Sequence, residues 1–401
     1  MADEDGSTTT QQEVAASPCC PSSEQQATQL KAEEIHYDAK EKAKAKENDS
    51  TNEGMTPPSQ KSMTTSRPRR KPFRATSFHR ERSWNLPHSE MFAKHDHCPA
   101  LALRTFSHRL KVGERRGSPC TLCYQLFGHG PKKLLFIMGY VTSSQVWAEQ
   151  VAYFAQPELG FQVCIFDNRG YPSSPSHRSM CFPTMEEYAK DTLELLDHLG
   201  WSLLHLVGFS MGGMVAQVMA ALQPERFITL TLAGTHAGGR HSMLPLGGVP
   251  KLLAFLRMKS KEEKVRAFIA INYSAKHLEH NGDKVFRWHF DKFDDMQFSG
   301  LVQQTLALLT HYVPTKQLLQ IKEAGIPVLV LTGTADLLVK PKNSEVLSNI
   351  LDAKLFYFEG AGHMLNSEDP VRFNQLIHQH ILSFSSSRSS SSSCSSSSSS
   401  S

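Results

Sequence analysis

The chain has 401 residues, a formal net charge of +4, eight cysteines and 40% hydrophobic residues. That length accommodates one large domain or two ordinary ones. The amino terminus is acidic and has no apolar core, so we expect neither a secretory signal nor a typical transit peptide. These features predict a cytoplasmic protein whose thiols stay reduced.

The hydrophobic residues are concentrated in the middle of the chain. Residues 1 to about 66 are rich in Gln, Ser, Thr, Glu and Lys, and residues 385–401 are almost pure serine. Segments of such composition bury too little apolar surface to offset their chain entropy. We therefore predict a disordered N-terminal region over 1–117, one globular domain over 118–384 and a disordered serine tail over 385–401.

A basic linker precedes the predicted domain. Residues 67–116 carry 13 Lys and Arg against 4 Asp and Glu, and the basic residues are densest in Arg67–Arg74. A run of this kind is typical of a nuclear-import signal or of a contact with acidic partners such as RNA or a membrane surface. The simpler interpretation is a solvated linker. Nuclear import and acidic partners stay open as alternatives.

The cysteines and the longest uncharged stretch give no sign of a metal site or a membrane span. Cys120 and Cys123 lie in one predicted strand on opposite faces, and no second pair with metal-ligand spacing follows. We expect no metal and no cofactor. Residues 200–224 carry no formal charge, but His205, Ser210 and several glycines there favour a buried strand and helix over a transmembrane span.

Strands and helices are predicted to alternate along the globular region. Apolar runs predict strands, and the intervening segments have helical patterning, including a capping box at Thr184 and Glu187. Alternation with near-continuous apolar strands predicts an α/β fold, with a mostly parallel central β-sheet and helices on both faces. The predicted strands are 120–127, 133–138, 161–166, 203–207, 228–232, 327–331 and 354–358.

Residues about 236–320 interrupt this alternation. They contain helical segments at 261–273 and 299–309, with several aromatic residues between them. An insertion between two strands at the carboxyl edge of the sheet predicts a helical lid above the active site. Its larger apolar side chains would either line a substrate pocket or form the core of the lid: Phe268, Trp288, Phe290, Phe293 and Met296.

Ser210 is the first candidate catalytic residue. It lies in Gly208-Phe209-Ser210-Met211-Gly212, between a predicted strand and a predicted helix. Such a turn lifts the hydroxyl clear of the sheet, and the helix N-terminus directs backbone N–H groups toward charge that develops beside it. A five-residue match is weak alone, so the chain must also supply a base and an acid.

His363 is the candidate for that base, and Asp336 is the candidate for that acid. Asp336 follows the predicted strand 327–331 and a tight turn, and His363 ends Gly360-Ala361-Gly362-His363 after the strand 354–358. A serine hydroxyl needs a histidine to accept its proton and a carboxylate to orient that histidine. An Asp in a turn can also serve only as a cap. The chain order Ser, Asp, His favours a triad.

With these motifs in place, the chain resembles the α/β-hydrolase superfamily, in its single-domain esterase, lactonase and haloperoxidase-like branch. The match runs from about Leu134 to Leu382. The resemblance implies that Ser210 is the nucleophile, His363 the general base and Asp336 the orienting acid. It also implies an oxyanion hole formed by the backbone N–H groups of Met211 and Tyr140. The matching segments are Met138-Gly139-Tyr140, Asp167-Asn168-Arg169-Gly170, the Ser210 turn, Gly333–Asp336 and Gly362-His363 with Glu368.

Two departures from the family pattern concern loops near the site. Met138 stands where many relatives carry His, which leaves the backbone donor after Gly139 unaffected. Pro172 follows Asp167-Asn168-Arg169-Gly170-Tyr171 and fixes a different loop path, so the edge of the pocket should differ. Asp167 and Arg169 are expected to hold this loop together.

The expected function is that of a cofactor-free serine hydrolase acting on a small, apolar carboxylic ester, lactone or related acyl compound. One alternative is an acyltransferase that uses the same triad. Some acyltransferases carry Asp five residues after the catalytic His, whereas this chain has Glu368. Another alternative is a non-catalytic small-molecule receptor or interaction protein of the same fold.

Overall fold

The fold is described from a computed structural model. The described residues are 107–176, 182–239, 258, 260–294 and 296–385. The predicted disordered segments up to residue 106 and from 386, with the basic run Arg67–Arg74, lie outside them. So do residues 240–257 of the expected lid.

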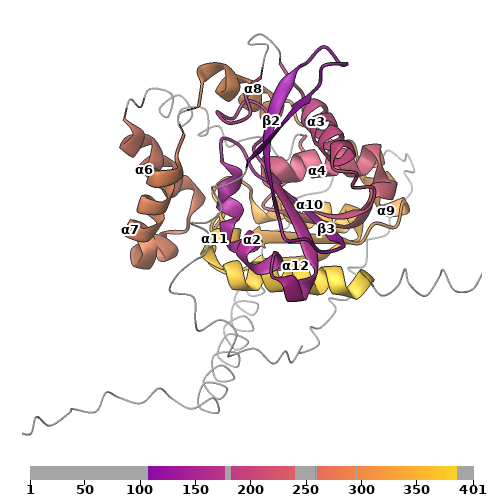
Figure 1. The fold of residues 1–401 in the computed structure, drawn as a ribbon. Coiled ribbons are helices and arrows are strands. Elements are labelled where there is room, and N and C mark those ends of the chain that lie inside the picture. Colours follow the sequence, from indigo (N-terminus) through magenta and orange to yellow (C-terminus); the bar gives the residue numbers. More distant parts are fainter. Residues whose placement is uncertain (1–106, 177–181, 240–257, 259, 295, 386–401) are drawn as a thin grey trace, which may run out of the picture. The chain divides into compact units, whose positions relative to one another are not determined.

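An eight-stranded mixed sheet forms the centre of the domain (Figure 1), with the strand order β1-β2-β4-β3-β5-β6-β7-β8. β1 and β2 are antiparallel to their neighbours, and the strands from β4 to β8 run parallel. The carboxyl ends of the parallel strands therefore meet at one edge. The strands are β1 His108–Val112, β2 Cys120–Phe127, β3 Lys132–Ile137, β4 Phe161–Phe166, β5 Leu204–Phe209, β6 Phe227–Ala233, β7 Val328–Gly333 and β8 Lys354–Phe358.

Helices cover both faces of this sheet, as predicted. One buried cluster joins the sheet to α3, α4, α9 and α10. The other joins its opposite face to α2 and α12, and also receives side chains from α6. The helices are α2 Ala148–Phe154, α3 Met185–His198, α4 Met211–Leu222, α6 Lys261–Asn272, α7 Ala275–Lys292, α8 Phe298–Leu309, α9 Thr315–Glu323, α10 Pro341–Leu351, α11 Leu365–Glu368 and α12 Pro370–Ser385.

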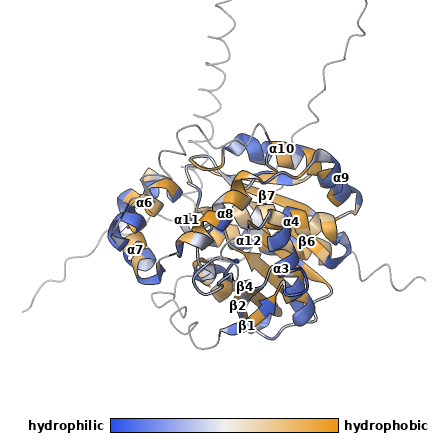
Figure 2. Ribbon diagram, turned by 90° about the horizontal axis from the view of Figure 1, so that it is seen from above, coloured by the Kyte–Doolittle hydropathy of each residue, from blue (hydrophilic) through white to orange (hydrophobic). Residues whose placement is uncertain are grey.

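The central strands are apolar because both of their faces are buried. Every residue of β5 and of β7 is buried. Figure 2 shows the hydrophobic residues gathered in the strands, with hydrophilic residues on the outer sides of helices such as α3 and α9. The stretch from Gly200 to Pro224 forms β5, the turn at Ser210 and α4. None of the helices in the described residues is long and apolar enough to cross a membrane.

The N-terminal boundary of the domain differs from the predicted start at residue 118. His108–Val112 forms β1 at the edge of the sheet and pairs with β2. Arg116 is anchored to α3 through Asp191 and Glu194. The sequence did not reveal this strand because an edge strand needs few apolar residues, and only Val112 of β1 is buried.

Two other local expectations can be compared with the structure. The capping box predicted at Thr184 does not form. The N-cap of α3 has no side-chain hydrogen bond. Helices α6, α7 and α8 follow β6 in the segment expected to form the lid, and α6 and α7 lie beside α11 (Figure 1). Four of the five aromatic and Met side chains considered there pack partly buried against the second core cluster: Phe268, Trp288, Phe290 and Phe293.

Candidate functional site

Ser210 lies at the sharp turn between β5 and α4. Its backbone has φ 54° and ψ −119°, a conformation that non-glycine residues rarely adopt. Two hydrogen bonds hold it: its N–H donates to the Ala233 carbonyl at 2.9 Å, and the Thr235 hydroxyl donates to its carbonyl at 2.8 Å. The end of β6 therefore supports the strained turn, and strain of this kind is common at functional sites.

The turn packs directly on the end of β3. A Cβ atom on Gly212 would lie 2.1 Å from the Ile137 carbonyl oxygen, so only glycine fits this contact. A Cβ atom on Gly139 would lie 3.1 Å from the Cβ of Ser210. Met211 precedes Gly212, and Tyr140 follows Gly139. The two residues implied as oxyanion donors are therefore adjacent in sequence to residues that make this contact.

Asp336 and His363 form a hydrogen-bonded pair at the same edge of the sheet. His363 Nδ1 and Asp336 Oδ2 are 2.7 Å apart, and both side chains are almost completely buried. The other carboxylate oxygen, Oδ1, accepts the N–H groups of Leu338 at 2.8 Å and Val339 at 2.9 Å. Asp336 therefore accepts hydrogen bonds within its own turn through Oδ1 and contacts the imidazole of His363 through Oδ2.

His363 lies close to the strand end that carries Ser210. Its ring centroid is 4.8 Å from that of Phe209, and a Cβ atom on Gly234 would lie 3.3 Å from His363 Cε1. Within the described residues, Ser210 Oγ makes no hydrogen bond to His363. Hydrogen bonds between a nucleophile and its base often shorten only in the substrate complex.

The loop after β4 has a structural role. Asp167 accepts the N–H of Ser144 at 2.6 Å, and burial raises the pKa of its carboxyl group. Asn168 donates to the Met138 carbonyl at 2.8 Å. Arg169 is 1% exposed and pairs with Asp191 at 2.7 Å. As expected for Asp167 and Arg169, these contacts hold the loop together, and they also hold the end of β3.

Glu368 links the histidine loop to the helices that follow β6. Its Oε1 accepts the N–H of Gly362 at 3.0 Å and the N–H of Ser274 at 2.6 Å. Its Oε2 accepts the Ser274 hydroxyl at 2.7 Å. Met364 N–H also donates to the Asn272 carbonyl at 2.8 Å. The α6–α7 junction is therefore bound to the residues on either side of His363.

Two further histidines, His205 and His236, have structural surroundings. His205 Nδ1 is 2.9 Å from the Thr229 hydroxyl inside the sheet. His236 lies nearer the site, and its carbonyl accepts Gln217 Nε2 at 3.1 Å and His311 Nε2 at 3.2 Å. Burial, with a smaller contribution from the nearby His363, lowers the pKa of His236 to about 4, and burial lowers the pKa of His205 to about 4 as well. Both histidines are therefore neutral near pH 7.

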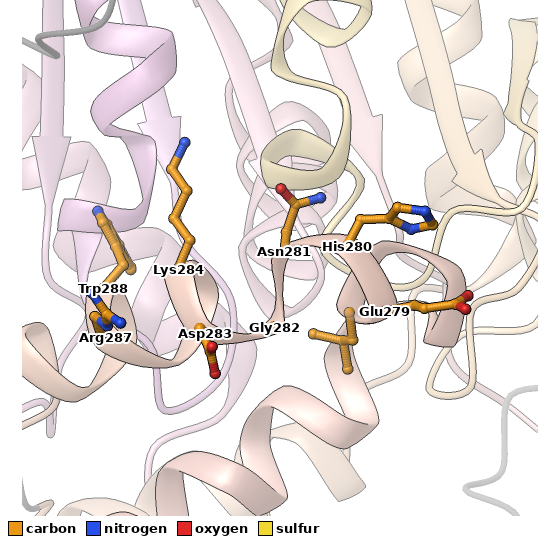
Figure 3. Close-up of a pocket in the computed structure, with 9 residues that line it drawn as sticks. Glu279, His280, Asn281, Gly282, Asp283, Lys284, Arg287 and Trp288 are labelled. Atoms are coloured by element: carbon orange, nitrogen blue, oxygen red, sulfur yellow. The ribbon is translucent and has the colours of Figure 1, made fainter.

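A surface hollow of about 690 Å³ lies along α7, away from these residues (Figure 3). Among the described residues, its lining comes from Leu278 to Trp288 of that helix and mixes acidic, basic and apolar side chains. It includes none of Ser210, Asp336 and His363. The chemistry of those three residues, and not the size of a hollow, identifies the candidate active site.

Some supporting residues could not have been identified from the sequence. Ser274 and Gln304 contact the loops of the site across 94 and 163 residues of sequence, with no local motif to mark them. Val141, next to Tyr140, has φ 52° although it is β-branched. Within the described residues, no group of three or more His, Cys, Asp or Glu side chains is arranged to hold a metal ion.

Comparison with known proteins identifies the family of this fold. Residues 132–370 match the family model of the α/β hydrolase fold. Among curated proteins, 3-oxoadipate enol-lactonase 1 of Acinetobacter baylyi is 25% identical over 280 residues, which cover 67% of this chain and 95% of that protein. The proline iminopeptidase of Lactobacillus delbrueckii is also 25% identical, over 62% of this chain and 90% of that protein.

Solved structures show the same fold. The enol-lactonase of Burkholderia xenovorans superimposes with a TM-score of 0.57 at 22% identity, over 66% of this chain and 97% of that one. A thermophilic esterase of Thermogutta terrifontis gives 0.57 at 21% identity, over 69% and 99%. The family match covers more than half of the chain, and the two curated relatives described above are hydrolytic enzymes by name. The chain belongs to the α/β-hydrolase fold family and is a hydrolase of that family.

Proposed function

We propose that the chain is a serine hydrolase that cleaves a small carboxylic ester, lactone or related acyl compound. Ser210 is the nucleophile, His363 the general base and Asp336 the acid that orients it. The observation that carries this proposal is the 2.7 Å hydrogen bond between His363 Nδ1 and Asp336 Oδ2. Because Nδ1 carries the proton shared with Asp336, Nε2 is left as the basic nitrogen.

The reaction then proceeds in two halves. Ser210 Oγ attacks the acyl carbon while its proton passes to His363 Nε2, and the carbonyl oxygen becomes an oxyanion. The N–H groups of Met211 and Tyr140 stabilise that charge. Collapse of the tetrahedral intermediate expels the leaving group, which takes the proton from His363. In the second half, His363 deprotonates water, which attacks the acyl carbon of the acyl-enzyme. The bond from that carbon to Ser210 Oγ then breaks, Oγ takes the proton back from His363, and the acid is released.

The proposed substrate class draws on two kinds of support. The curated relatives include a 3-oxoadipate enol-lactonase, which by name acts on a lactone, and a proline iminopeptidase, which by name is a peptidase. Within this chain, α6, α7 and α8 follow β6, in the segment proposed to form a lid over the site. A lid that excludes water strengthens the electrostatic interactions within the site.

Substitution of the nucleophile tests the proposal. The full-length protein and Ser210→Ala are compared for turnover of p-nitrophenyl esters and for labelling by a fluorophosphonate probe. Ser210→Ala should lose labelling and at least about 10⁴-fold in kcat. Ser202→Ala, which removes an exposed serine before β5, is the matched control and should behave as wild type. A folded Ser210→Ala that still hydrolyses the esters would contradict the proposal.

The products distinguish hydrolysis from acyl transfer. With an added acceptor alcohol, a hydrolase gives mainly the free acid, whereas an acyltransferase gives mainly the new ester. Glu368, at the position where some acyltransferases carry Asp, is bonded to Gly362 and Ser274. We therefore assign it a role in holding the histidine loop and expect the free acid.

A further inference from the structure

The loop after β3 is held by side chains from α8. The N–H of Val141 donates to Gln304 Oε1 at 2.8 Å, and Gln304 Nε2 donates to the Arg169 carbonyl at 3.0 Å. One residue further along α8, the Thr305 hydroxyl is 2.7 Å from the Tyr140 hydroxyl. Two consecutive residues of α8 thus contact two consecutive residues of this loop.

The peptide group between Tyr140 and Val141 is fixed through both of its polar atoms. Its carbonyl oxygen accepts the Thr142 hydroxyl at 2.9 Å, while its N–H donates to Gln304. Gln304 is 1% exposed, so water does not compete for this contact. An orphaned buried N–H costs about 1–3 kcal/mol, which favours the conformation in which Gln304 accepts it.

Val141 itself adopts a strained conformation. Its φ of 52° is unusual for a β-branched residue. Backbone strain of this kind costs about 1–3 kcal/mol and persists only where the surroundings impose it. The hydrogen bond that the Val141 N–H donates to Gln304 is one of the interactions that impose this conformation.

Helix α8 lies against the loop after β4, which allows these hydrogen bonds to form. A Cβ atom on Gly300 would lie 2.0 Å from the Gly170 carbonyl oxygen, so the helix comes within direct contact of the loop after β4. Gln304 lies one turn further along the same helix and spans the loops that follow β3 and β4. Gln304 therefore connects α8 to both loops, through the Arg169 carbonyl and the Val141 amide.

We propose that Gln304 is a positioning residue for catalysis, which fixes the loop that carries the Tyr140 N–H donor. This inference rests on the proposed function, in which that N–H group stabilises the oxyanion. A donor contributes fully only when it lies about 2.7–3.1 Å from the developing charge, so a small displacement of the loop weakens it. Gln304 acts through Tyr140 and does not touch the reacting atoms.

Two substitutions at this position give opposite results. Gln304→Leu removes both hydrogen bonds and should lower kcat about 10- to 100-fold, with KM changed less than about 3-fold. Gln304→Glu in its neutral form, which burial favours, can accept from Val141 and donate to Arg169. Its activity relative to wild type should therefore rise as the pH falls. A purely structural role would not lower kcat while leaving KM nearly unchanged, and it would not restore the activity of Gln304→Glu at low pH.

A remote buried amide provides the control. Asn374 on α12 is 4% exposed and donates to the Glu149 carbonyl at 3.3 Å. Asn374→Leu should lower the thermal unfolding temperature as Gln304→Leu does, but should leave kcat within about twofold of wild type. Hydrogen exchange at the Val141 amide should become faster in Gln304→Leu and stay unchanged in Asn374→Leu.

The outcomes separate the two proposals. If folded Gln304→Leu keeps kcat within twofold of an active wild type, or if Val141 exchange is unchanged, the positioning role of Gln304 is wrong and the hydrolase proposal stands. If Ser210→Ala retains wild-type turnover, the hydrolase proposal is wrong and the role of Gln304 falls with it.

Discussion

The central sheet and the loops of the candidate site are held by different interactions. β5 and β7 are wholly buried and pack through apolar side chains. By contrast, the loops of the site are held by directional hydrogen bonds, which Val141 donates to Gln304 and Ser274 donates to Glu368. Apolar burial supplies stability without fixing direction, whereas hydrogen bonds fix the orientation of a few atoms. Substitutions in the two regions should therefore affect different measurements.

The largest expected effect is a loss of kcat, caused by a substitution in the loops of the site. Asp336→Asn preserves volume, but its amide group disfavours the Nδ1-protonated form of His363. We expect kcat to fall about 10⁴-fold, equivalent to about 5 kcal/mol of transition-state stabilisation. The free energy of unfolding should change by less than about 1.5 kcal/mol. Ester turnover and urea denaturation measure the two quantities, and comparable kcat values for variant and wild type would reject the assigned role.

The core should show the reverse behaviour. Phe161 is 1% exposed at the start of β4, at the opposite end of that strand from the site, and its ring lies 5.4 Å from Phe154. Phe161→Ala leaves a cavity and should lower the free energy of unfolding by about 3–5 kcal/mol. The kcat of the folded protein should stay within about twofold. A large loss of kcat without a loss of unfolding free energy would contradict the expected difference between the core and the loops of the site.

The α6–α7 junction should give an intermediate effect. Ser274 caps α7 and also donates to Glu368, whereas Ser260 caps α6 in an exposed capping box. Ser260→Ala should cost about 1 kcal/mol of unfolding free energy. Ser274→Ala should cost about 1–2 kcal/mol more, because a hydrogen bond to a carboxylate is also lost. Equal losses in urea denaturation would show that Glu368 contributes nothing to the junction.

Acid should weaken the fold through its buried histidines. Burial lowers the pKa of His289 on α7 to about 4, from 6.5 in the unfolded chain. Between pH 6.5 and 4 the unfolded state therefore binds more protons, so stability falls as pH falls, by up to about 1.4 kcal/mol per pH unit for this residue. His289→Gln should make the dependence shallower by that amount. An unchanged slope would mean that His289 is not neutral in the fold.

The smallest effect is expected on the surface. Lys190 and Glu186 form an ion pair of 2.8 Å on α3, with side chains 38% and 54% exposed. Exposed pairs of this kind contribute about 0–0.5 kcal/mol. Lys190→Ala should change neither kcat nor, by more than that amount, the free energy of unfolding. A larger loss would show that polar contacts stabilise this fold outside the site as well.

The sequence predicts the sheet well, for physical reasons, and it also provides local motifs that mark the three candidate residues. Strands buried on both faces read as continuous apolar runs, and β4 and β8 have the predicted limits. Ser210, Asp336 and His363 follow strands and carry local motifs, so each can be recognised from its neighbours in sequence.

Other features depend on tertiary contacts that leave no local pattern. Gln304 reads as an ordinary helical residue, because its partner Val141 is 163 residues away. Thr184 and Glu187 have the spacing of a capping box, yet the N-cap of α3 forms no such bond. Instead, Glu187 lies 3.5 Å from Arg116, a partner that local spacing does not reveal.

The edge strand β1 has a consequence for solubility. Among the described strands it pairs only with β2, and it exposes His108, Arg109 and Lys111. Charged residues on an edge strand discourage pairing with a second molecule. A fragment beginning at residue 118 would leave β2, with its buried Leu122 and Tyr124, as the new edge. Such a fragment should aggregate, whereas one that begins before Ser107 should remain monodisperse.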